Sequence, residues 1–249
     1  MPRIPDTVTA CLFDLDGVLT DTASVHRGAW KQMFDGYLRA RSDDTGEPFV
    51  PFTDRDYERY VDGRPRLDGT RGFLRSRGID LPEGGPDDPP GTPTVHGLGN
   101  QKNELVLRLL DEHGVTVFDG SVRLVRAVRD KGLRTAVVSS SANTAQVLEV
   151  AGIADLFEVR VDGGVAAERG LAGKPAPDTF LAGAGDLGVD PTAAVVFEDA
   201  LAGVAAGRAG GFGLVVGVDR VGQRQALLEH GADIVVDDLA ELLDEEGNA

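Results

Sequence analysis

Cysteine, positive charge and long apolar runs are all scarce in this sequence of 249 residues. The single cysteine, Cys11, cannot form a disulfide within the chain, and its place in an apolar run predicts a buried, unreactive thiol. Lysine and arginine number 25 against 41 aspartate and glutamate residues, so the formal net charge is -16. A field of this sign argues against binding to nucleic acid or to an anionic membrane surface.

The apolar segments are too short to cross a bilayer, which needs about 20 consecutive apolar residues. Met1–Asp6 also lacks the apolar core of a signal peptide. We therefore expect a cytoplasmic protein with no membrane partner. The length suffices for one large α/β domain and a smaller one. Because the negative field repels anions, a phosphorylated substrate would require local positive charge or a metal ion.

The most informative segment is Asp14-Leu15-Asp16-Gly17, which follows the apolar run Val8–Phe13. Such a run is typical of a buried strand, and Gly17 permits a sharp turn after the second aspartate. We expect both carboxylates at the carboxyl end of the strand, where open α/β sheets bind ligands. Taken alone, the pair could also be an acidic, solvated turn.

Three later segments end in polar residues of complementary kinds. An apolar run over 133–138 leads into Ser139-Ser140-Ser141-Ala142-Asn143, and another over 193–197 leads into Glu198-Asp199. Between them, Lys174 lies at a predicted loop-to-helix junction. Each has a structural alternative: Ser139 could cap the next helix, Lys174 could be a surface charge, and the two acids could begin a helix. Their joint occurrence in this order favours a shared site.

Helices and strands alternate from Gly120 onward. We expect helices at 121–131, 143–151, 178–187, 200–209 and 221–230, and strands at 133–138, 158–161, 193–197, 213–218 and 233–236. Such alternation implies right-handed crossovers and a parallel sheet covered by helices on both faces. The carboxyl ends of its strands, and with them the polar segments above, would gather along one edge.

Residues 22–115 are predicted to be mostly helical, with helices at 22–40 and 100–113 and a surface loop rich in Pro, Gly and Asp at 80–93. The first helix should be capped by Asp21 or Thr22. Its expected buried positions are Val25, Ala29, Met33 and Leu38. The sequence therefore predicts an α/β fold with a Rossmann-like, doubly wound parallel sheet formed by residues 1–21 and 116–249, and a helical cap domain inserted at 22–115.

The order Asp-x-Asp, Ser, Lys-Pro and Glu-Asp resembles the four motifs of the haloacid dehalogenase (HAD) superfamily, and the helical insertion resembles its cap. The resemblance implies that Asp14 is a nucleophile toward phosphorus and that Asp16 is the general acid and base. It implies Mg²⁺ as the cofactor, held by Asp14, Glu198, Asp199 and the backbone carbonyl of Asp16. Ser139 would donate a hydrogen bond to the phosphate. Lys174 would balance the charge of the nucleophile and the phosphate.

Residues of the predicted cap resemble the β-phosphoglucomutase family within that superfamily. His26 and Trp30 lie one helical turn apart, Gly63-Arg64-Pro65-Arg66 resembles the family's cap loop, and Lys102 matches its cap lysine. The resemblance implies that Arg66 grips the distal phosphate of a bisphosphorylated sugar. The implied substrate-binding residues are His26, Trp30, Gly63, Arg66, Lys102, Ser140, Ser141 and Asn143.

The chain departs from that family's pattern in three places. Ala142 stands where the family often has a lysine, Gly69 or Thr70 stands near a family serine, and the loop at 80–93 is additional. These departures concern the sugar contacts and leave the phosphoryl-transfer residues intact.

The resemblance implies a Mg²⁺-dependent, monomeric phosphotransferase that interconverts β-glucose 1-phosphate and glucose 6-phosphate through an aspartyl-phosphate and glucose 1,6-bisphosphate. The alternative enzyme is a phosphatase of small sugar phosphates, in which water reaches the aspartyl-phosphate. A non-catalytic binding protein of the same fold is disfavoured because both Asp14 and Asp16 are present. In the predicted cap, Trp30 could instead be a core aromatic, and His26, Arg66 and Lys102 could be solvated surface residues.

Overall fold

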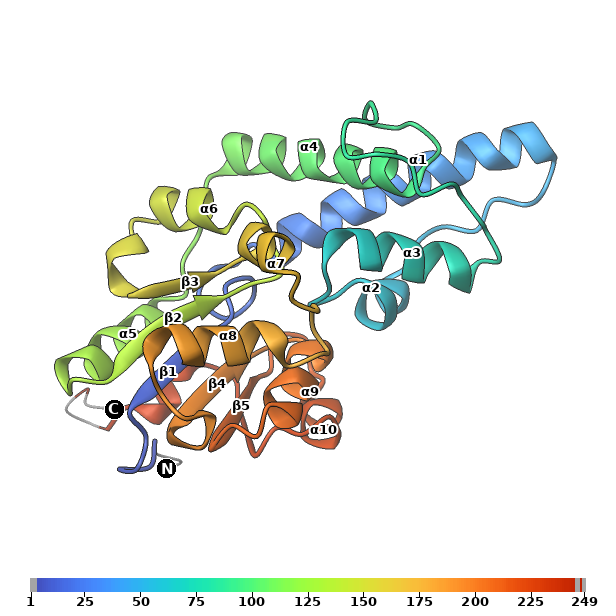
Figure 1. The fold of residues 1–249 in the computed structure, drawn as a ribbon. Helices are drawn as coiled ribbons and strands as arrows, with labels where there is room; N and C mark the ends of the chain where they lie inside the picture. The colour runs from blue at the N-terminus through green and yellow to red at the C-terminus, as the bar shows by residue number, and fades with distance from the viewer. Residues whose placement is uncertain (1–3, 245–246, 248–249) are drawn as a thin grey trace. The chain divides into compact units, whose positions relative to one another are not determined.

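The computed structural model describes residues 4–244 and 247, and the chain divides into two compact units (Figure 1). One unit is formed by Met1–Asp21 and Val115–Ala249 and is called the core unit below; the other, Thr22–Gly114, is called the helical unit. The ranges expected from the sequence differ from these by one residue, Val115. That the helical unit acts as a cap domain remains a proposal.

A parallel sheet of six strands, counted within the described residues, forms the centre of the core unit in the order β3-β2-β1-β4-β5-β6. The strands are β1 (Ala10–Phe13), β2 (Arg134–Val138), β3 (Val159–Val161), β4 (Ala194–Glu198), β5 (Leu214–Val218) and β6 (Ile234–Val236). β1 lies between β2 and β4, with Phe13 opposite Val137 on one side and Phe197 on the other. All four residues of β1 are buried. The predicted α/β fold is confirmed.

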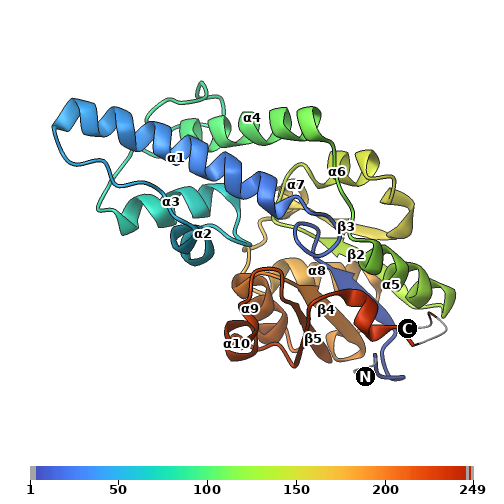
Figure 2. The ribbon, with the colours of Figure 1, turned by 180° about the vertical axis from the view of Figure 1, so that it is seen from behind.

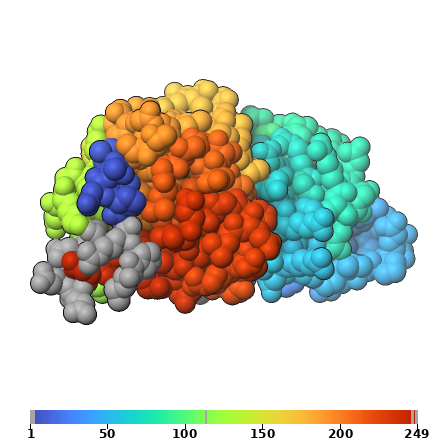
Figure 3. Space-filling view, turned by 90° about the horizontal axis from the view of Figure 1, so that it is seen from below, coloured from blue at the N-terminus to red at the C-terminus, as the bar shows by residue number. Residues whose placement is uncertain are grey.

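Helices cover the sheet on both faces (Figures 1 and 2). They are α5 (Asp119–Asp130), α6 (Thr144–Val150), α7 (Gly163–Arg169), α8 (Asp178–Leu187), α9 (Leu201–Ala209) and α10 (Arg224–Glu229), with short 3₁₀ turns η1 (Ala154–Leu156), η2 (Pro191–Ala193) and η3 (Leu239–Leu242). α8 packs on β1, β2 and β3, α9 on β4 and β5, and α10 on β5 and β6. α5 packs on β2 and against η3. The orange and red surface of α8–α10 and the C-terminal segment is seen from below in Figure 3.

Two elements of the core unit differ from the sequence-based expectation. α7 is not predicted; it has only seven residues, Gly163–Arg169, which is too short for a clear helical period, and none of them is fully buried. It begins where Asp162 accepts the Val165 N–H at 2.9 Å. α10 begins at Arg224 instead of residue 221, because the Asp219 carboxylate binds the backbone N–H groups of residues 221–224 and holds them in a turn.

The helical unit consists of α1 (Ala23–Thr45), α2 (Asp54–Tyr60), α3 (Arg66–Ser76) and α4 (Val95–His113). α1 packs along α4, and α3 packs on α4 and α2. The aromatic rings of Trp30, Phe34, Phe52 and Phe73 form its core, with the Phe34 and Phe73 centroids 4.2 Å apart. In the described part of the chain, no helix is long and apolar enough to cross a membrane.

α1 and α4 are both longer than predicted. α1 continues to Gly46, whose φ of 75° ends it in the left-handed conformation. Thr22 is its N-cap residue, one of the two predicted, although the Thr22 side chain makes no capping hydrogen bond. Val25 is only half-buried. α4 begins at Val95 because the Thr94 hydroxyl accepts the Gly97 N–H at 2.9 Å.

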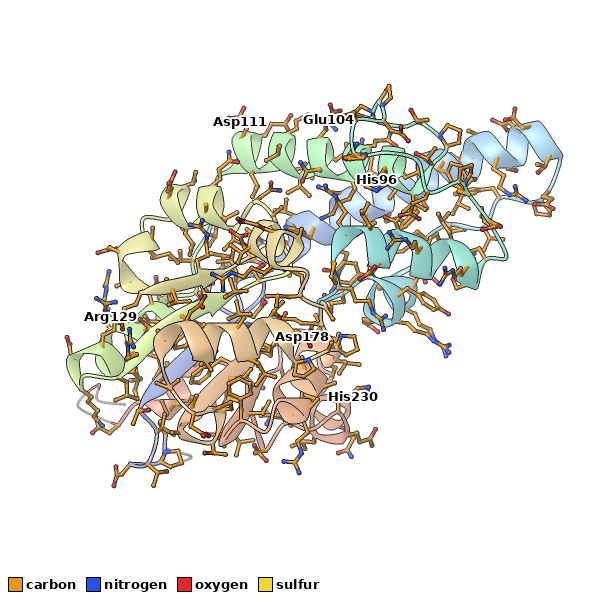
Figure 4. The ribbon with its side chains drawn as sticks, viewed as in Figure 1. His96, Glu104, Asp111, Arg129, Asp178 and His230 are labelled. Carbon is orange, nitrogen blue, oxygen red and sulfur yellow. The ribbon has the colours of Figure 1, made fainter. Side chains whose placement is uncertain are left out.

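The predicted loop at 80–93 contains no helix or strand in the structure. It is nevertheless held against α4, since Asn100 Nδ2 donates to the carbonyls of Pro86 and Asp88 at 3.0 Å. Glu83 forms an ion pair with Arg71 of α3 and lies 3.9 Å from His96, which Figure 4 labels at the start of α4.

Candidate active site

The turn that follows β1 brings the two aspartates of the first motif to the carboxyl edge of the sheet. The Asp14 N–H donates to the Phe197 carbonyl at 3.0 Å, which extends the pairing with β4 by one residue. The Leu15 carbonyl accepts the N–H groups of Leu19 and Thr20, which closes a tight turn around Gly17. Asp14 is buried, whereas Asp16 is half-buried.

Gly17 is required in this turn for two reasons. Its φ of 88° is a left-handed conformation that side chains disfavour. A Cβ atom at this position would also overlap the carboxylate of Asp199. The turn after β1 and the segment after β4 are therefore in direct contact.

Three neighbouring strands contribute polar side chains at this edge: Asp14 after β1, Ser139 after β2, and Glu198 with Asp199 at the end of β4. Ser139 is buried, and its hydroxyl accepts the Ser141 N–H at 3.1 Å. α6 begins only at Thr144, with Asn143 as its N-cap residue, so Ser139 is not a helix cap. Ser140, Ser141 and Asn143 are half-buried in the same turn.

Lys174 connects two of these acids. Its Nζ lies 2.5 Å from Asp14 Oδ1 and 2.6 Å from Glu198 Oε1, and it donates to the Val138 carbonyl at 3.1 Å. The three donors of its ammonium group are thereby all used. Lys174 is only 2% exposed, so the alternative of a surface charge is wrong.

The loop that carries Lys174 is fixed by the start of α8. Asp178, labelled in Figure 4 at that position, accepts the Ala172 N–H at 3.2 Å. The Lys174 ammonium group lies 4.7 Å from the centre of the Phe180 ring, which shields it from water. Lys174 thus reaches the sheet edge from a separate element whose position is set by α8.

Glu198 is fully buried at the end of β4. Its Oε1 binds Lys174 and its Oε2 accepts the Ala200 N–H at 2.9 Å. Gly203 of α9 lies against this carboxylate, because a Cβ at that position would overlap Oε1. The absence of a side chain at Gly203, in the first turn of α9, thereby leaves space for the buried Glu198 carboxylate.

Burial raises the pKa of the Asp14 carboxyl well above its usual range; Lys174 opposes this effect, and the charges of Glu198 and Asp16 add to it. Burial alone would lower the pKa of Lys174, but Asp14 and Glu198 raise it above its usual value. Lys174 is therefore a cation at neutral pH. The single positive charge of Lys174 does not balance the negative charges of the surrounding carboxylates. A further cation at this edge would therefore stabilise the ionised form of Asp14.

A divalent cation fits the donor chemistry of this edge. Among the described residues, the carboxylates of Asp14, Glu198 and Asp199 offer oxygen atoms that all lie within 4.8 Å of one another. Carboxylate oxygens are the ligands that hard divalent cations prefer. Each Glu198 oxygen keeps a second lone pair beside its hydrogen-bond donor, so it can also face a metal. The carboxylate of Asp16 is not part of this group.

The helical unit brings three of its predicted residues together. Lys102 Nζ lies 2.8 Å from Nδ1 of His26 and 5.1 Å from the centre of the Trp30 ring. Lys102 is 5% exposed and is therefore not a surface charge. Trp30 is 3% exposed and stacks on Phe34, so it is a core aromatic of this unit; a substrate contact for it remains a proposal.

Arg66 begins α3, directly after the turn that contains Gly63. Among the described residues, no carboxylate lies within ion-pair distance of its guanidinium, and its buried Nε has no hydrogen-bond partner. Burial lowers the pKa of Arg66 below its usual value. Gly99 of α4 lies beside it: a Cβ there would be in ordinary contact with Arg66 Nε at 3.6 Å, and the close approach at this glycine, 2.9 Å, is to Leu67 Cδ2. Gly99 and Lys102 are one helical turn apart on the same face of α4.

Two residues after β5 also reach the acidic edge, and the sequence analysis missed them. Arg220 Nε donates to the Gly17 carbonyl at 2.8 Å, and Gln223 Nε2 donates to the Asp199 carbonyl at 3.0 Å. The available signal was their position directly after a predicted strand, since parallel strands share their carboxyl edge.

Comparison with known proteins agrees with this geometry. The family model of the haloacid dehalogenase-like hydrolases matches residues 8–211. β-Phosphoglucomutases of Mycobacterium tuberculosis and Mycobacterium bovis are 59% identical over 244 residues, which cover 96% of this chain and 93% of theirs. The β-phosphoglucomutase of Bacillus subtilis is 33% identical over 233 residues, 94% of this chain and 91% of that protein.

The fold is likewise that of a solved β-phosphoglucomutase. The crystal structure from Clostridium difficile has a TM-score of 0.75 and 26% sequence identity, and the match covers 96% of this chain and 95% of that one. The sheet order, the acidic edge and the matching family model define a member of the HAD-like hydrolase superfamily. Within that superfamily, the chain belongs to the β-phosphoglucomutase family.

Proposed function

We propose that this chain is a phosphoryl-transfer mutase that interconverts β-glucose 1-phosphate and glucose 6-phosphate through an aspartyl-phosphate on Asp14. The observation that carries the proposal is the buried triad in which Lys174 binds both Asp14 and Glu198 at the carboxyl edge of the sheet. The 59% identity to curated β-phosphoglucomutases supports the mutase reaction and a phosphorylated sugar as the substrate.

Asp14 attacks the phosphorus atom, and the sugar oxygen leaves with a proton donated by Asp16. In the second half-reaction Asp16 removes a proton from the incoming sugar hydroxyl, which attacks the aspartyl-phosphate. The half-buried position of Asp16 suits this role, because its proton must be exchanged with the substrate. Lys174 holds the charge of the nucleophile, and the buried hydroxyl of Ser139 donates to a phosphate oxygen.

We propose Mg²⁺ as the metal, held by Asp14, Glu198, Asp199 and the backbone carbonyl of Asp16. When bound, it would offset the negative charge of the phosphate and of these carboxylates.

Replacing Asp199 by alanine should weaken Mg²⁺ binding by at least about tenfold, because even outer partners of metal ligands typically contribute that much. The stability of the metal-free protein should change little, since one of several mutually repelling carboxylates is removed. Calorimetric titration with Mg²⁺ and urea unfolding in chelator measure the two effects. Unchanged Mg²⁺ affinity, or full activity of the wild type in excess chelator, would remove the metal from the account.

The helical unit would supply the grip on the phosphate that is not being transferred. A mutase must bind a bisphosphorylated sugar in two orientations, which requires a cation for the second phosphate. Arg66 is our candidate, because its half-buried guanidinium has no carboxylate partner among the described residues and can bind a phosphate bidentately. Lys102 and His26, which are bonded to each other, are the candidates for the sugar hydroxyls.

Replacing Arg66 by alanine should lower the mutase kcat/KM at least about tenfold, the loss expected for a charge-assisted hydrogen bond. Phosphorylation of Asp14 by acetyl phosphate should change much less, because that donor has no second phosphate. The exposed Arg75 of the same helix, replaced by alanine, is the matched control. Equal damage to both reactions, or to neither, would contradict a distal-phosphate role.

Product identity tests the function as a whole. The protein is incubated with Mg²⁺ and β-glucose 1-phosphate, with and without glucose 1,6-bisphosphate, and glucose 6-phosphate and free phosphate are followed together. A mutase forms glucose 6-phosphate, faster when the bisphosphate is present, with little free phosphate. Release of phosphate in step with substrate loss would instead identify a phosphatase.

A further inference from the structure

The segment Asp219–Gln223, which follows β5, contacts two segments of the candidate active site. One is the turn after β1 that contains Asp16 and Gly17, and the other is the end of β4 with Asp199. Arg220 Nε donates to the Gly17 carbonyl at 2.8 Å, next to Asp16 in the chain. Gln223 Nε2 donates to the Asp199 carbonyl at 3.0 Å. Gly17 and Asp199 are themselves in contact, because a Cβ on Gly17 would overlap the Asp199 carboxylate. The two hydrogen bonds therefore bind the turn after β1 and the end of β4 at a place where these segments are already in direct contact.

The segment is itself a fixed structure. Asp219 Oδ1 accepts the N–H groups of Val221, Gly222 and Gln223 at 3.3, 2.7 and 2.8 Å, and Oδ2 accepts that of Arg224 at 3.0 Å. Burial alone would raise the pKa of Asp219, but these backbone donors lower it below its usual value. Asp219 is therefore ionised at neutral pH and holds the segment in one conformation.

The Arg220 side chain is held through its Nε, its Nη1 and the face of its guanidinium, while its buried Nη2 has no hydrogen-bond partner among the described residues. Its guanidinium lies 3.7 Å from the centre of the Phe118 ring, and Nη1 donates to the Asp237 carbonyl at 3.0 Å. Nη1 also lies 3.7 Å from Asp238 Oδ2, and the side chain is only 18% exposed. A planar guanidinium held in this way presents Nε in a single direction.

Phe118 connects the same arginine to the far end of the nucleophile turn. The Phe118 N–H donates to the Leu19 carbonyl at 2.9 Å, and Ser121 Oγ donates to the Val18 carbonyl at 2.6 Å. The carbonyls of three successive residues, Gly17 to Leu19, are thus held by separate donors, of which Arg220 carries a positive charge. Asp16 immediately precedes this fixed stretch.

We propose that Asp219–Gln223 is a positioning clamp with two arms. In the first arm, Arg220 binds the Gly17 carbonyl and thereby holds the adjacent Asp16 in place for proton transfer. In the second arm, Gln223 binds the Asp199 carbonyl and thereby holds Asp199 in place for metal binding. This inference rests on the proposed function. Arg220 and Gln223 are positioning residues, because they act through Asp16 and Asp199. Small displacements of a general acid reduce catalysis strongly, which gives the clamp its effect.

Replacing Arg220 by methionine removes the donor and keeps an apolar stem over Phe118. The expected result is at least about a tenfold fall in kcat with β-glucose 1-phosphate, part of the 10²- to 10⁴-fold contribution of a general acid and base. Phosphorylation of Asp14 by acetyl phosphate should change less than about threefold, because the acetate leaving group needs no proton. A merely structural role would slow both reactions alike.

The matched control is Arg224→Met. Arg224 lies on α10, bonds to Asp237 and Val235, and is exposed, so its loss should leave both rates unchanged. Arg220→Lys should recover part of the lost kcat, since an ammonium group can still donate to the Gly17 carbonyl. Equal slowing of the two reactions by Arg220→Met, or no slowing of the sugar reaction, would overturn this arm.

Replacing Gln223 by leucine tests the second arm without touching Arg220. Calorimetric titration should show Mg²⁺ binding weakened by about tenfold, as for other residues that support metal ligands. Unchanged affinity would overturn that arm. If the wild type turned over some other sugar phosphate, the proposed function would fail. The clamp would still be tested by comparing the effect of Arg220→Met on the rate with that sugar phosphate and on the rate of Asp14 phosphorylation by acetyl phosphate.

Discussion

Replacing Asp14 by asparagine is expected to abolish turnover of β-glucose 1-phosphate. The amide keeps the volume of the carboxylate but cannot attack phosphorus, so no aspartyl-phosphate forms. The fold should persist, because Lys174 keeps its bonds to Glu198 and to the Val138 carbonyl when Asp14 is neutral. Steady-state assays and mass spectrometry of the acetyl phosphate-treated protein measure the two losses, of turnover and of phosphorylation.

Asp186→Asn is the matched control for this variant. Asp186 of α8 is exposed and pairs with Arg169 of α7, and the same chemical change there should leave activity intact. Residual activity of Asp14→Asn above about one-tenth of the wild type would remove Asp14 as the nucleophile. Circular dichroism and urea unfolding of both variants establish that a loss of activity is not a loss of fold.

Replacing Asp16 by asparagine should reduce kcat with the sugar phosphate by about 10²- to 10⁴-fold, the usual contribution of a general acid and base. Acetyl phosphate should still phosphorylate Asp14, because its leaving group needs no proton. Mg²⁺ affinity should be retained, since the proposed ligand is the backbone carbonyl of Asp16. The resulting aspartyl-phosphate should persist, as the variant lacks the base that activates the incoming hydroxyl.

The Asp16 variant distinguishes a role of Asp16 as the general acid and base from a role in which it acts on Asp14 or on the metal. Unchanged kcat would mean that another residue moves the proton. Loss of acetyl phosphate transfer together with sugar turnover would mean that Asp16 acts on Asp14 or on the metal instead of on the leaving group. Rapid-quench measurement of phosphorylated protein distinguishes these outcomes within one experiment.

Three of the four core motifs could be predicted because each lies at the end of a strand with a clearly apolar sequence. Parallel strands share a carboxyl edge, so Asp14, Ser139 and Glu198 had to meet once the strands were identified. Lys174 could be added from its motif, although its burial and its bonds to both Asp14 and Glu198 depend on how α8 fixes the loop.

The remaining contacts depend on tertiary structure that periodicity does not encode. Arg220 binds Gly17 across a separation of 203 residues; its position after a predicted strand indicates the sheet edge but not this partner. The late start of α10 results from four backbone hydrogen bonds to one aspartate. The contact between Lys102 and His26 requires α1 and α4 to pack face to face, which spacing alone does not specify.

The central claim is that Asp14 carries the phosphoryl group between sugar molecules. The most direct test is a rapid-quench experiment with wild-type protein, Mg²⁺, β-glucose 1-phosphate and glucose 1,6-bisphosphate radiolabelled in its phosphoryl groups. The account predicts that label appears first on the peptide containing Asp14, at least as fast as turnover, and then in glucose 6-phosphate with little in free phosphate. Label that never enters the protein, or that reaches free phosphate in step with substrate loss, would contradict it.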